Sequence, residues 1–261
     1  MFLHKALVTI CFLLTFSVAA FAKPIKVGII AGPSVDVLDL AKKLAKKKYN
    51  LDVEPVVFTD YIMPNEAVNS GDIDMNMFQT VSYLKQSIAK RNYKLISIGN
   101  TFIYPMGIFS KKIKTISELK EKGSIAIPND PSNEGRALLL LDRAGLIKLR
   151  PDCGEFANLK DITSNPKNLK ISTLNSSQIP RVIPDVDAVV LNNDFVNNAG
   201  FKPSEALVHE DARIAKPYIN IIVAKESQQN NEDYKKFVSI MNSHEVLVKT
   251  MQLYPGAVKA W

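Results

Sequence analysis

The sequence predicts an α/β protein with two small sheets that are rich in parallel strands. Strand-like and helix-like segments alternate along the chain, which is typical of βαβ units whose strands lie parallel. About ten strand-like segments in residues 23–261 suit two sheets better than one wide sheet. The composition, 46% apolar and 23% charged, excludes a disordered or collagen-like chain.

The N-terminal segment predicts export. A short basic start precedes an apolar stretch at 6–19, and Ala20-Phe21-Ala22 has the small-x-small pattern of a cleavage site. We interpret residues 1–22 as a signal peptide that is cleaved after Ala22. A membrane anchor is the alternative, but no apolar run reaches the roughly 18 residues of a spanning helix. Cys11 lies within the apolar run and not at its end, so we expect no lipid attachment.

The first half of the mature chain begins with a strand and a helix. Residues 25–31 are apolar and β-branched and end at Gly32-Pro33, as a buried strand does. A helix is expected at 34–49, because its apolar residues recur on one stripe. Its lysines lie mostly off that stripe and lack interleaved aromatic residues, which indicates a solvated face and no nucleic-acid site. Further strands are expected at 51–58, 73–75, 94–103 and 105–110, and helices at 64–70, 78–93 and 117–122.

The second half repeats the alternation. Residues 124–128 predict a compact strand that leads directly into a helix. Asp130 followed by Pro131 favours the start of that helix, and Gly145 favours its end. Later strands are expected at 169–174, 187–191, 206–210 and 218–225, and a mostly helical segment at 233–252.

Catalytic and metal-binding motifs are absent from the sequence. There is no P-loop, no dinucleotide-binding glycine motif, no His-Glu-x-x-His and no Gly-x-Ser-x-Gly. After the expected cleavage the chain keeps one cysteine, Cys153, and two histidines, His209 and His244. We interpret Cys153 as a loop thiol and His209 as a side chain that is either hydrogen-bonded within the protein or exposed to solvent. The sequence therefore predicts binding and no catalysis, with no cofactor and no metal.

The segment 124–136 has the local chemistry of an anion site. A strand runs into a helix whose first turn holds small polar residues, and the free N–H groups at a helix N-terminus attract anions. Arg136 lies within the first two turns and could hold a carboxylate with two parallel hydrogen bonds. A surface arginine on an amphipathic helix is the alternative.

This segment also carries a resemblance to a known family. Asn129-Asp130-Pro131-Ser132-Asn133-Glu134-Gly135-Arg136, followed by Ala144-Gly145-Leu146, resembles the methionine-binding substrate-binding proteins of ABC importers, the NlpA lipoprotein family. Blocks in the same order along nearly the whole mature chain agree: Phe58-Thr59-Asp60-Tyr61, Pro64-Asn65-Glu66-Ala67, Gly71-Asp72-Ile73-Asp74, Asn165-Pro166-Lys167-Asn168, Tyr218-Ile219-Asn220 and Gly256-Ala257-Val258-Lys259-Ala260-Trp261.

The resemblance implies a two-lobed periplasmic-binding-protein fold, similar to type II, with a hinge and a ligand cleft. It places residues 23–106 and 224–261 in lobe I and residues 107–223 in lobe II. It implies a periplasmic receptor, expected as a monomer, that binds L-methionine or a close analogue. The partners implied are the membrane permease and the ATPase of an ABC importer. An enzyme on the same fold is the alternative class, since a fold does not determine a function.

The resemblance also implies roles for three residues at the centre of the site. Arg136 matches the family arginine that binds the α-carboxylate, and Tyr61 and Phe78 match the aromatic residues that line the thioether pocket. Aromatic rings suit a thioether, because sulfur gains energy from contact with them. Core packing is the alternative for both rings. If Arg136 faces an open cleft, Arg136→Ala should weaken binding and leave the stability of the ligand-free protein nearly unchanged.

Four further residues complete the predicted site. Asn192 and Asn220 match family asparagines whose amides serve both ends of a zwitterion, and strand-end or turn positions are the alternative. Tyr104 fits a cleft or hinge position. The family usually has Phe-Gln-His where this chain has Phe78-Gln79-Thr80, so Thr80 removes a ring and a titratable group. The pocket could therefore suit a related amino acid or a short peptide that contains methionine.

Overall fold

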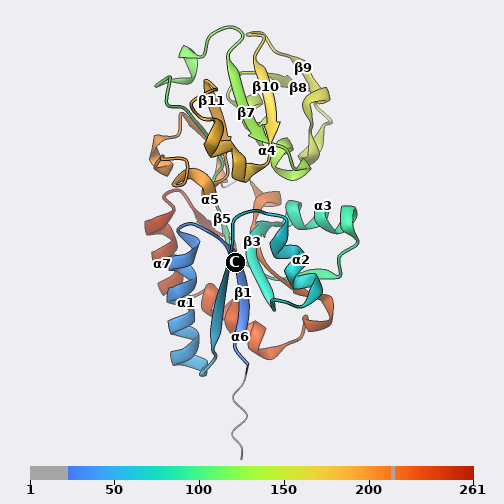
Figure 1. Cartoon of the computed structure of the whole chain (residues 1–261), viewed down its shortest axis with the longest axis vertical. Coiled ribbons are helices and arrows are strands. Elements are labelled where there is room, and N and C mark those ends of the chain that lie inside the picture. Colours follow the sequence, from blue (N-terminus) through green and yellow to red (C-terminus); the bar gives the residue numbers. More distant parts are fainter. Residues whose placement is uncertain (1–22, 213–214) are drawn as a thin grey trace, which may run out of the picture.

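The computed structural model describes residues 23–212 and 215–261, which form two lobes stacked along the long axis of the molecule (Figure 1). The first lobe holds the two ends of the described chain, drawn in blue, teal and red, and the second lobe holds its middle. The expected signal peptide, 1–22, lies outside the described residues. Over the described ranges, no helix combines the length and the apolar character needed to cross a membrane. The predicted two-lobed α/β fold is confirmed.

A five-stranded sheet in the order β2-β1-β3-β13-β4 forms the centre of the first lobe. Its strands are β1 Ile25–Ile30, β2 Val53–Phe58, β3 Met75–Thr80, β4 Leu95–Asn100 and β13 Asn220–Lys225. β1 pairs parallel with β2 and β3, whereas β13 runs antiparallel to β3 and β4. The sheet is mixed because β13 returns from the second lobe and starts at the cleft end, where β3 finishes.

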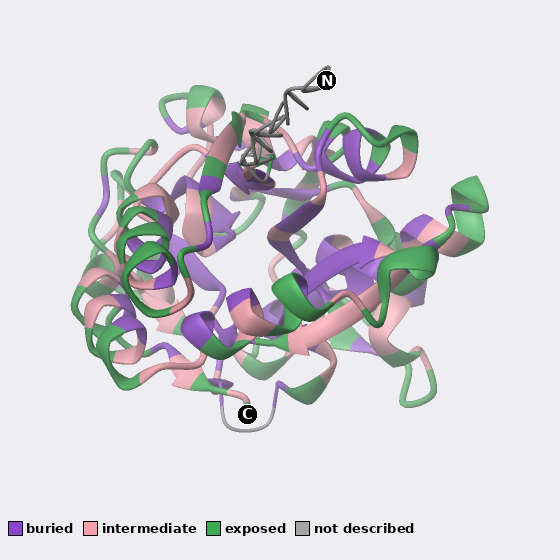
Figure 2. Ribbon diagram, turned by 90° about the horizontal axis from the view of Figure 1, so that it is seen from below, coloured by how far each residue is buried: buried purple, intermediate pink, exposed green. Residues whose placement is uncertain are grey.

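Five helices pack around this sheet: α1 Ser34–Tyr49, α2 Met63–Ser70, α3 Val81–Arg91, α6 Glu232–Met241 and α7 His244–Leu253. α1 buries Val37, Leu38 and Ala41 in a core that also contains Ile29 and Phe237. Burying a side chain of the size of Leu or Ile contributes about 1.5–3 kcal/mol. The lysines of α1 are exposed, as its apolar stripe predicts. Figure 2 shows the buried segments inside the molecule and the exposed segments around them.

A second five-stranded sheet, in the order β10-β7-β11-β6-β12, forms the centre of the second lobe. Its strands are β6 Gly107–Phe109, β7 Ser124–Pro128, β10 Lys170–Leu174, β11 Ala188–Leu191 and β12 Val208–His209. The helices α4 Pro131–Arg143 and α5 Asn193–Val196 and the strand pair β8 Lys148–Leu149 and β9 Ile162–Ser164 complete the lobe. α4 buries Leu138 and Leu141 against Ile125 and Ile127 of β7.

The chain ends where the first segment crosses between the lobes. There β5, Phe102–Ile103, pairs antiparallel with β14, Val258–Lys259, and the ring of Trp261 lies 5.0 Å from that of Phe102. The return crossing differs from expectation. Residues 220–223, expected in lobe II, belong through the hydrogen bonds of β13 to the first sheet. The other lobe boundaries stay predictions.

β3 differs from the predicted short strand at 73–75, because it continues to Thr80 and α3 begins only at Val81. The sequence pattern does not indicate a strand here, because the segment contains the polar residues Asn76 and Gln79. Both are buried and hydrogen-bonded to Asn65 of α2, with 2.9 Å from Asn65 Nδ2 to Gln79 Oε1 and from Asn76 Nδ2 to Asn65 Oδ1. A partner from another element thus makes a polar strand stable.

Two predicted helices also differ. The segment 117–122 contains only a 3₁₀ turn at Ile116–Glu118. The helical segment at 233–252 is divided into two helices. α6 ends at Met241, and α7 begins after its N-cap, Ser243. The hydroxyl oxygen of Ser243 accepts a hydrogen bond from the Val246 N–H at 3.4 Å, and serine is a favoured N-cap.

Candidate binding site between the two lobes

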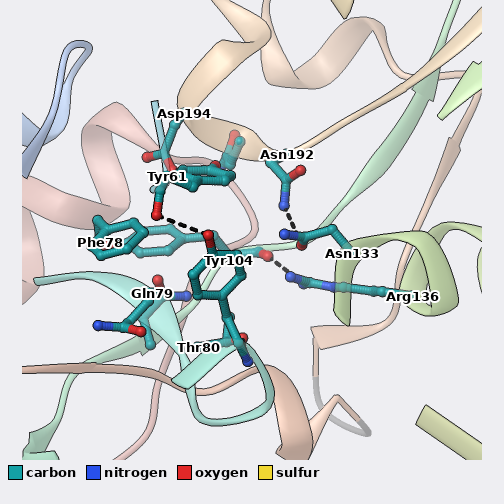
Figure 3. A pocket seen from close by; sticks show the side chains of 12 residues that line it. Tyr61, Phe78, Gln79, Thr80, Tyr104, Asn133, Arg136, Asn192 and Asp194 are labelled. Carbon is teal, nitrogen blue, oxygen red and sulfur yellow. Dashed lines mark hydrogen bonds between the residues drawn. The ribbon is translucent and has the colours of Figure 1, made fainter. Parts of the chain in front are cut away.

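A cavity of about 30 Å³ lies between the lobes, and side chains from both lobes converge on it (Figure 3). The structure brings all seven predicted site residues together around this one cavity: Tyr61, Phe78, Thr80, Tyr104, Arg136, Asn192 and Asn220. A water molecule needs roughly 10–15 Å³ of such space. An amino acid therefore enters only when the lobes or the side chains between them move.

Aromatic rings form one wall of the cavity. The Tyr61 ring lies 5.5 Å from that of Phe78 and 5.9 Å from that of Tyr83, all three in the first lobe. The same ring lies 5.2 Å from Phe195 of the second lobe. The Tyr83 hydroxyl donates a hydrogen bond to the Tyr61 carbonyl oxygen at 2.8 Å. The wall is therefore aromatic and polarizable, and it contacts the second lobe through Phe195.

Arg136 lies in the second turn of α4, and only 4% of its side chain is exposed. Its Nε donates to both carboxylate oxygens of Glu210 at 3.1 Å, and its Nη2 forms an ion pair with the same carboxylate. Nη2 also donates to the Tyr104 carbonyl oxygen at 2.8 Å. The Tyr218 ring covers the guanidinium at 4.4 Å. The two buried charges neutralise each other.

This pairing changes what Arg136 offers to a ligand. The two parallel hydrogen bonds expected for a ligand carboxylate are already made to Glu210, and within the described chain only Nη1 has no hydrogen-bond partner. A ligand carboxylate therefore meets one free nitrogen beside a neutralised pair. Sequence reasoning missed Glu210, because it lies 74 residues from Arg136 and follows an ordinary short strand.

Asn192 follows β11 directly, and its side chain is held by a neighbouring amide. Its Nδ2 donates to Asn133 Oδ1 at 2.7 Å, and Asn133 Nδ2 donates to the Asp130 carboxylate at 3.0 Å. An ionised carboxylate only accepts hydrogen bonds, so this chain determines which way each amide points. Asn192 Oδ1 is consequently left as a buried acceptor with no hydrogen-bond partner in the described residues.

Asn220 and Thr80 lie opposite each other where β13 pairs with β3. This register places both at the cleft end of the first sheet. Asn220 is the first residue of β13, whereas the strand predicted at 218–225 would place it inside the strand. Tyr104 lies just beyond β5 on the first crossing segment, and its ring is 4.7 Å from that of Tyr254.

Asp194 of α5 brings a carboxylate to the cavity that the sequence analysis did not predict. Its Oδ2 accepts a hydrogen bond from the Tyr61 hydroxyl at 2.7 Å, which links the two lobes. Burial raises the pKa of Asp194 to about 6, although the hydrogen bond from Tyr61 acts in the opposite direction. The remaining lining residues that were not predicted are Gln79, Tyr83, Asn133 and Asn193.

Weak signals for some of these residues were present in the sequence. Asn133 belongs to the segment 129–136 that carries the family resemblance, and Asp194 follows Asn192 by two positions. An acidic residue after a strand is, however, common at the exposed start of a helix. Only the packing of α5 against the first lobe distinguishes Asp194 from such a residue.

Thr80 has a structural role in addition to its place in the cavity. Its Oγ1 accepts a hydrogen bond from the Tyr83 N–H at 3.1 Å and so caps α3. We expect Thr80→Ala to lower the free energy of unfolding by about 0.5–2 kcal/mol, the range for losing an N-cap. Thr80→Ser keeps the hydroxyl and should retain most of the stability. Urea denaturation measures both, and equal stability of the alanine variant and the wild type would contradict the capping role.

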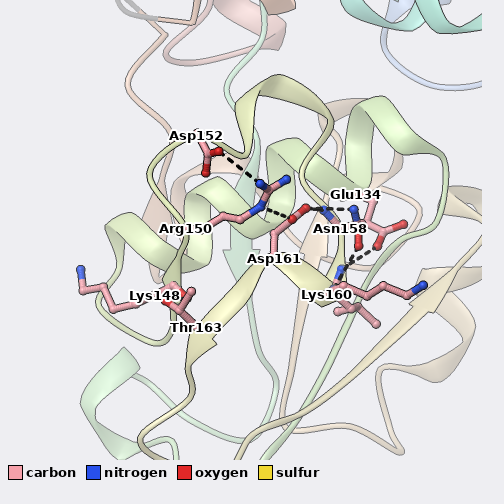
Figure 4. Close-up of polar contacts among 9 residues, drawn as sticks. Glu134, Lys148, Arg150, Asp152, Asn158, Lys160, Asp161 and Thr163 are labelled. Carbon is pink, nitrogen blue, oxygen red and sulfur yellow. Dashed lines mark hydrogen bonds and ion pairs between the residues drawn. The ribbon is translucent and has the colours of Figure 1, made fainter.

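A second polar cluster lies on the second lobe and does not belong to the cavity (Figure 4). Arg150 Nε donates to Asp161 Oδ1 at 2.6 Å, and Asp161 Oδ2 accepts from the Asn158 N–H at 2.8 Å. These bonds lower the pKa of Asp161. The cluster stabilises the loop that follows β8. Cys153 lies in the same loop region and is a free, half-buried thiol, as predicted.

Comparison with known proteins agrees with this architecture. The NlpA lipoprotein family matches residues 25–261. The chain is 45% identical over 240 residues to the D-methionine-binding lipoprotein MetQ of Salmonella typhimurium, covering 91% of this chain and 88% of that protein.

Two solved structures are also similar. The crystal structure of the methionine-binding protein MetQ has a TM-score of 0.88 and 45% identity, and covers 91% of this chain and 98% of that one. A nutrient-binding protein from Burkholderia cenocepacia, bound to methionine, has a TM-score of 0.87 and 41% identity, and covers 91% of this chain and 100% of that one.

The comparisons correct one expectation. The similar MetQ protein is named a lipoprotein, which contradicts the expectation that this chain has no lipid attachment. The placement of Cys11 inside an apolar run was a weak basis for that expectation. The resemblance found in the sequence is confirmed, because the match extends over nearly the whole described chain: this protein belongs to the NlpA lipoprotein family.

Proposed function

We propose that this protein is a receptor that captures methionine between its two lobes and delivers it to the permease and ATPase of an ABC importer. The observation that carries the proposal is a cavity built jointly by both lobes, with an aromatic wall and polar side chains around it. The similar proteins named for methionine binding, and the Burkholderia cenocepacia protein bound to methionine, support the same assignment.

The aromatic wall suits the side chain of methionine. A thioether is apolar and polarizable, and a contact between sulfur and an aromatic ring contributes about 0.3–1.5 kcal/mol. Tyr61 and Phe78 offer two such rings. The polar ends of the amino acid would then meet Arg136 Nη1, Asn192 and Asn220, which line the same cavity.

The division of the site between the lobes couples binding to closure. Tyr61, Phe78 and Asn220 come from the first lobe, whereas Arg136 and Asn192 come from the second. A ligand shifts an equilibrium between open and closed lobes only by its different affinity for the two states. Because methionine would contact both lobes, it would favour the closed state.

We place this receptor in the periplasm and assign it no catalytic activity. The described residues contain no group of three or more His, Cys, Asp or Glu side chains that could hold a metal ion. The lining residues of the cavity include no histidine, cysteine or lysine, and the carboxylate among them, Asp194, accepts a hydrogen bond from the Tyr61 hydroxyl. Binding and release are the chemistry that such a cavity supports.

A short peptide that contains methionine is the second candidate ligand. A hollow of about 290 Å³ adjoins the cavity and shares Tyr61 and Tyr83 with it. If these two rings swing aside, the two spaces form one longer site. The added hollow is lined by polar and charged side chains, among them Lys90, Arg91 and Asp130, which suit a peptide backbone better than an apolar side chain.

Mass spectrometry of the solute released on denaturing the purified protein tests the proposal directly, and we expect methionine. Calorimetric titration of the stripped protein with both enantiomers of methionine then gives the stereochemical preference. Norleucine has a similar shape without sulfur and should bind more weakly by about 0.3–1.5 kcal/mol. If another solute is released and methionine produces no heat, the methionine assignment fails and only the receptor class remains.

A further inference from the structure

The charges around the cavity do not balance. Of the twelve described residues that line it, two carry formal charges, Arg136 and Asp194. The positive charge of Arg136 is already matched by Glu210, and both side chains are at least 96% buried. Asp194 accepts a hydrogen bond from neutral Tyr61 and has no cationic partner in the described part of the chain. Arg136, Glu210 and Asp194 together therefore leave an excess negative charge at the cavity.

A second observation also points to a positively charged ligand group at this cavity. Asn192 is 9% exposed, and its Oδ1 lacks a hydrogen-bond donor in the described residues while its Nδ2 is committed to Asn133. Leaving a buried acceptor unpaired costs about 1–3 kcal/mol. Asn192 and Asp194 thus present an unpaired amide oxygen and an unneutralised carboxylate to one small cavity. A positively charged group with several N–H donors satisfies both.

We propose that Asp194 is the counter-ion of the α-ammonium group of the bound amino acid, with Asn192 Oδ1 as a second acceptor. The inference rests on the proposed function and identifies the side chain that selects ligands with a primary amine. The Tyr61 hydroxyl, 2.7 Å from Asp194, positions the carboxylate from the opposite lobe. Ligands that carry a hydroxyl or an acylated nitrogen in place of the ammonium leave the negative charge without a partner, so they bind more weakly.

The environment of Asp194 also makes binding depend on pH. Burial raises its pKa to about 6, and the ammonium requires the ionised carboxylate. Affinity is therefore full above this pKa and falls as the pH drops through it, by roughly tenfold between pH 7 and pH 5. The other titratable or charged groups around this site are Tyr61, Tyr83, Tyr104, Tyr254, Asp130, Arg136 and Glu210.

The other titratable groups around Asp194 do not produce the same dependence of affinity on pH. Burial raises the pKa of Tyr61, Tyr104 and Tyr254, so their hydroxyls stay neutral between pH 5 and pH 8. Arginine side chains in general do not lose their proton in proteins. Burial also raises the pKa of Asp130, but this residue remains in an Asp194 variant. A comparison of the wild type with that variant therefore isolates the contribution of Asp194.

The test is calorimetric titration of the full-length, stripped protein and its Asp194→Asn variant with methionine between pH 5 and pH 8. A parallel series uses the analogue in which a hydroxyl replaces the α-ammonium. We expect Asp194→Asn to weaken methionine binding on the order of 30-fold or more at pH 7, the lower end for breaking a buried charge pair. The variant should lose the pH dependence and most of the preference for methionine over the hydroxy analogue.

Two controls accompany the titration. Asp185→Asn makes the same charge change at an exposed position of the second lobe and should leave both affinities unchanged. The ligand-free Asp194→Asn variant should unfold at the same temperature as the wild type or higher, because it removes a buried charge without a partner. The pH profile of the wild type needs no variant, so it tests the proposal independently of folding.

Three results would overturn the assignment: unchanged methionine affinity in Asp194→Asn, equal weakening of methionine and the hydroxy analogue, or a flat pH profile in the wild type. The failure of the proposed function is a separate outcome. If the wild type does not bind methionine but releases another amine on denaturation, the same comparison is made with that amine and its N-acetyl derivative. If it binds no amine, both proposals are wrong.

Discussion

Arg136→Ala is expected to lower the free energy of unfolding of the ligand-free protein by about 3–5 kcal/mol, the range for removing one partner of a buried ion pair. The guanidinium and the Glu210 carboxylate are 4% and 3% exposed, so alanine would leave a buried carboxylate without a counter-ion. The sequence suggested instead that an arginine facing an open cleft would contribute to binding alone. Urea denaturation of the ligand-stripped protein distinguishes a role of Arg136 in stability from a role in binding alone.

The double variant Arg136→Met with Glu210→Leu serves as the matched control. It replaces both charges by apolar side chains of similar size, and such replacements of buried ion pairs are often neutral or stabilising. We expect it to recover most of the stability lost in Arg136→Ala but none of the affinity for methionine, because no nitrogen remains for the ligand carboxylate. Equal stability of Arg136→Ala and the wild type would show that the ion pair does not form in the ligand-free state.

Tyr61→Ala is expected to produce a second large loss, about 3–5 kcal/mol in the free energy of unfolding, the range for truncating a buried aromatic residue. The ring is 8% exposed and contacts Phe78, Tyr83 and Phe195. Because Phe195 belongs to the other lobe, the change also weakens the contact that holds the lobes together. Calorimetry should show a smaller preference for methionine over norleucine, since one of the two rings beside the sulfur is lost and Phe78 remains.

Tyr61→Phe is the control that separates the ring from the hydroxyl. It keeps the aromatic wall and removes only the hydrogen bond to Asp194, so the loss of stability should be smaller, about 1.5–3 kcal/mol for a bond to a charged group. The preference for methionine over norleucine should survive in this variant. If Tyr61→Phe loses as much of that preference as Tyr61→Ala, the aromatic wall is not what recognises sulfur.

Much of the fold could be predicted because its signals are local. The apolar run at 124–128 is β7, and the stripe of α1 ends at Tyr49, as the pattern indicates. Asp130 caps α4 by accepting the Asn133 N–H at 3.0 Å, as its place before Pro131 suggests. The prediction that β3 ends at residue 75 is wrong, because its buried polar residues Asn76 and Gln79 gain hydrogen-bond partners from α2, which no local pattern shows.

The sequence by itself determined the α/β class, most of the strands and helices and, through the family resemblance, seven residues that meet at one cavity. Only the tertiary structure decided what those residues do to one another. It paired Arg136 with Glu210 and placed the carboxylate of Asp194 opposite Tyr61. The physical reason is that charge compensation and hydrogen bonding depend on neighbours in space. Arg136 and Glu210 are 74 positions apart and Tyr61 and Asp194 are 133 apart, so no local pattern encodes either contact.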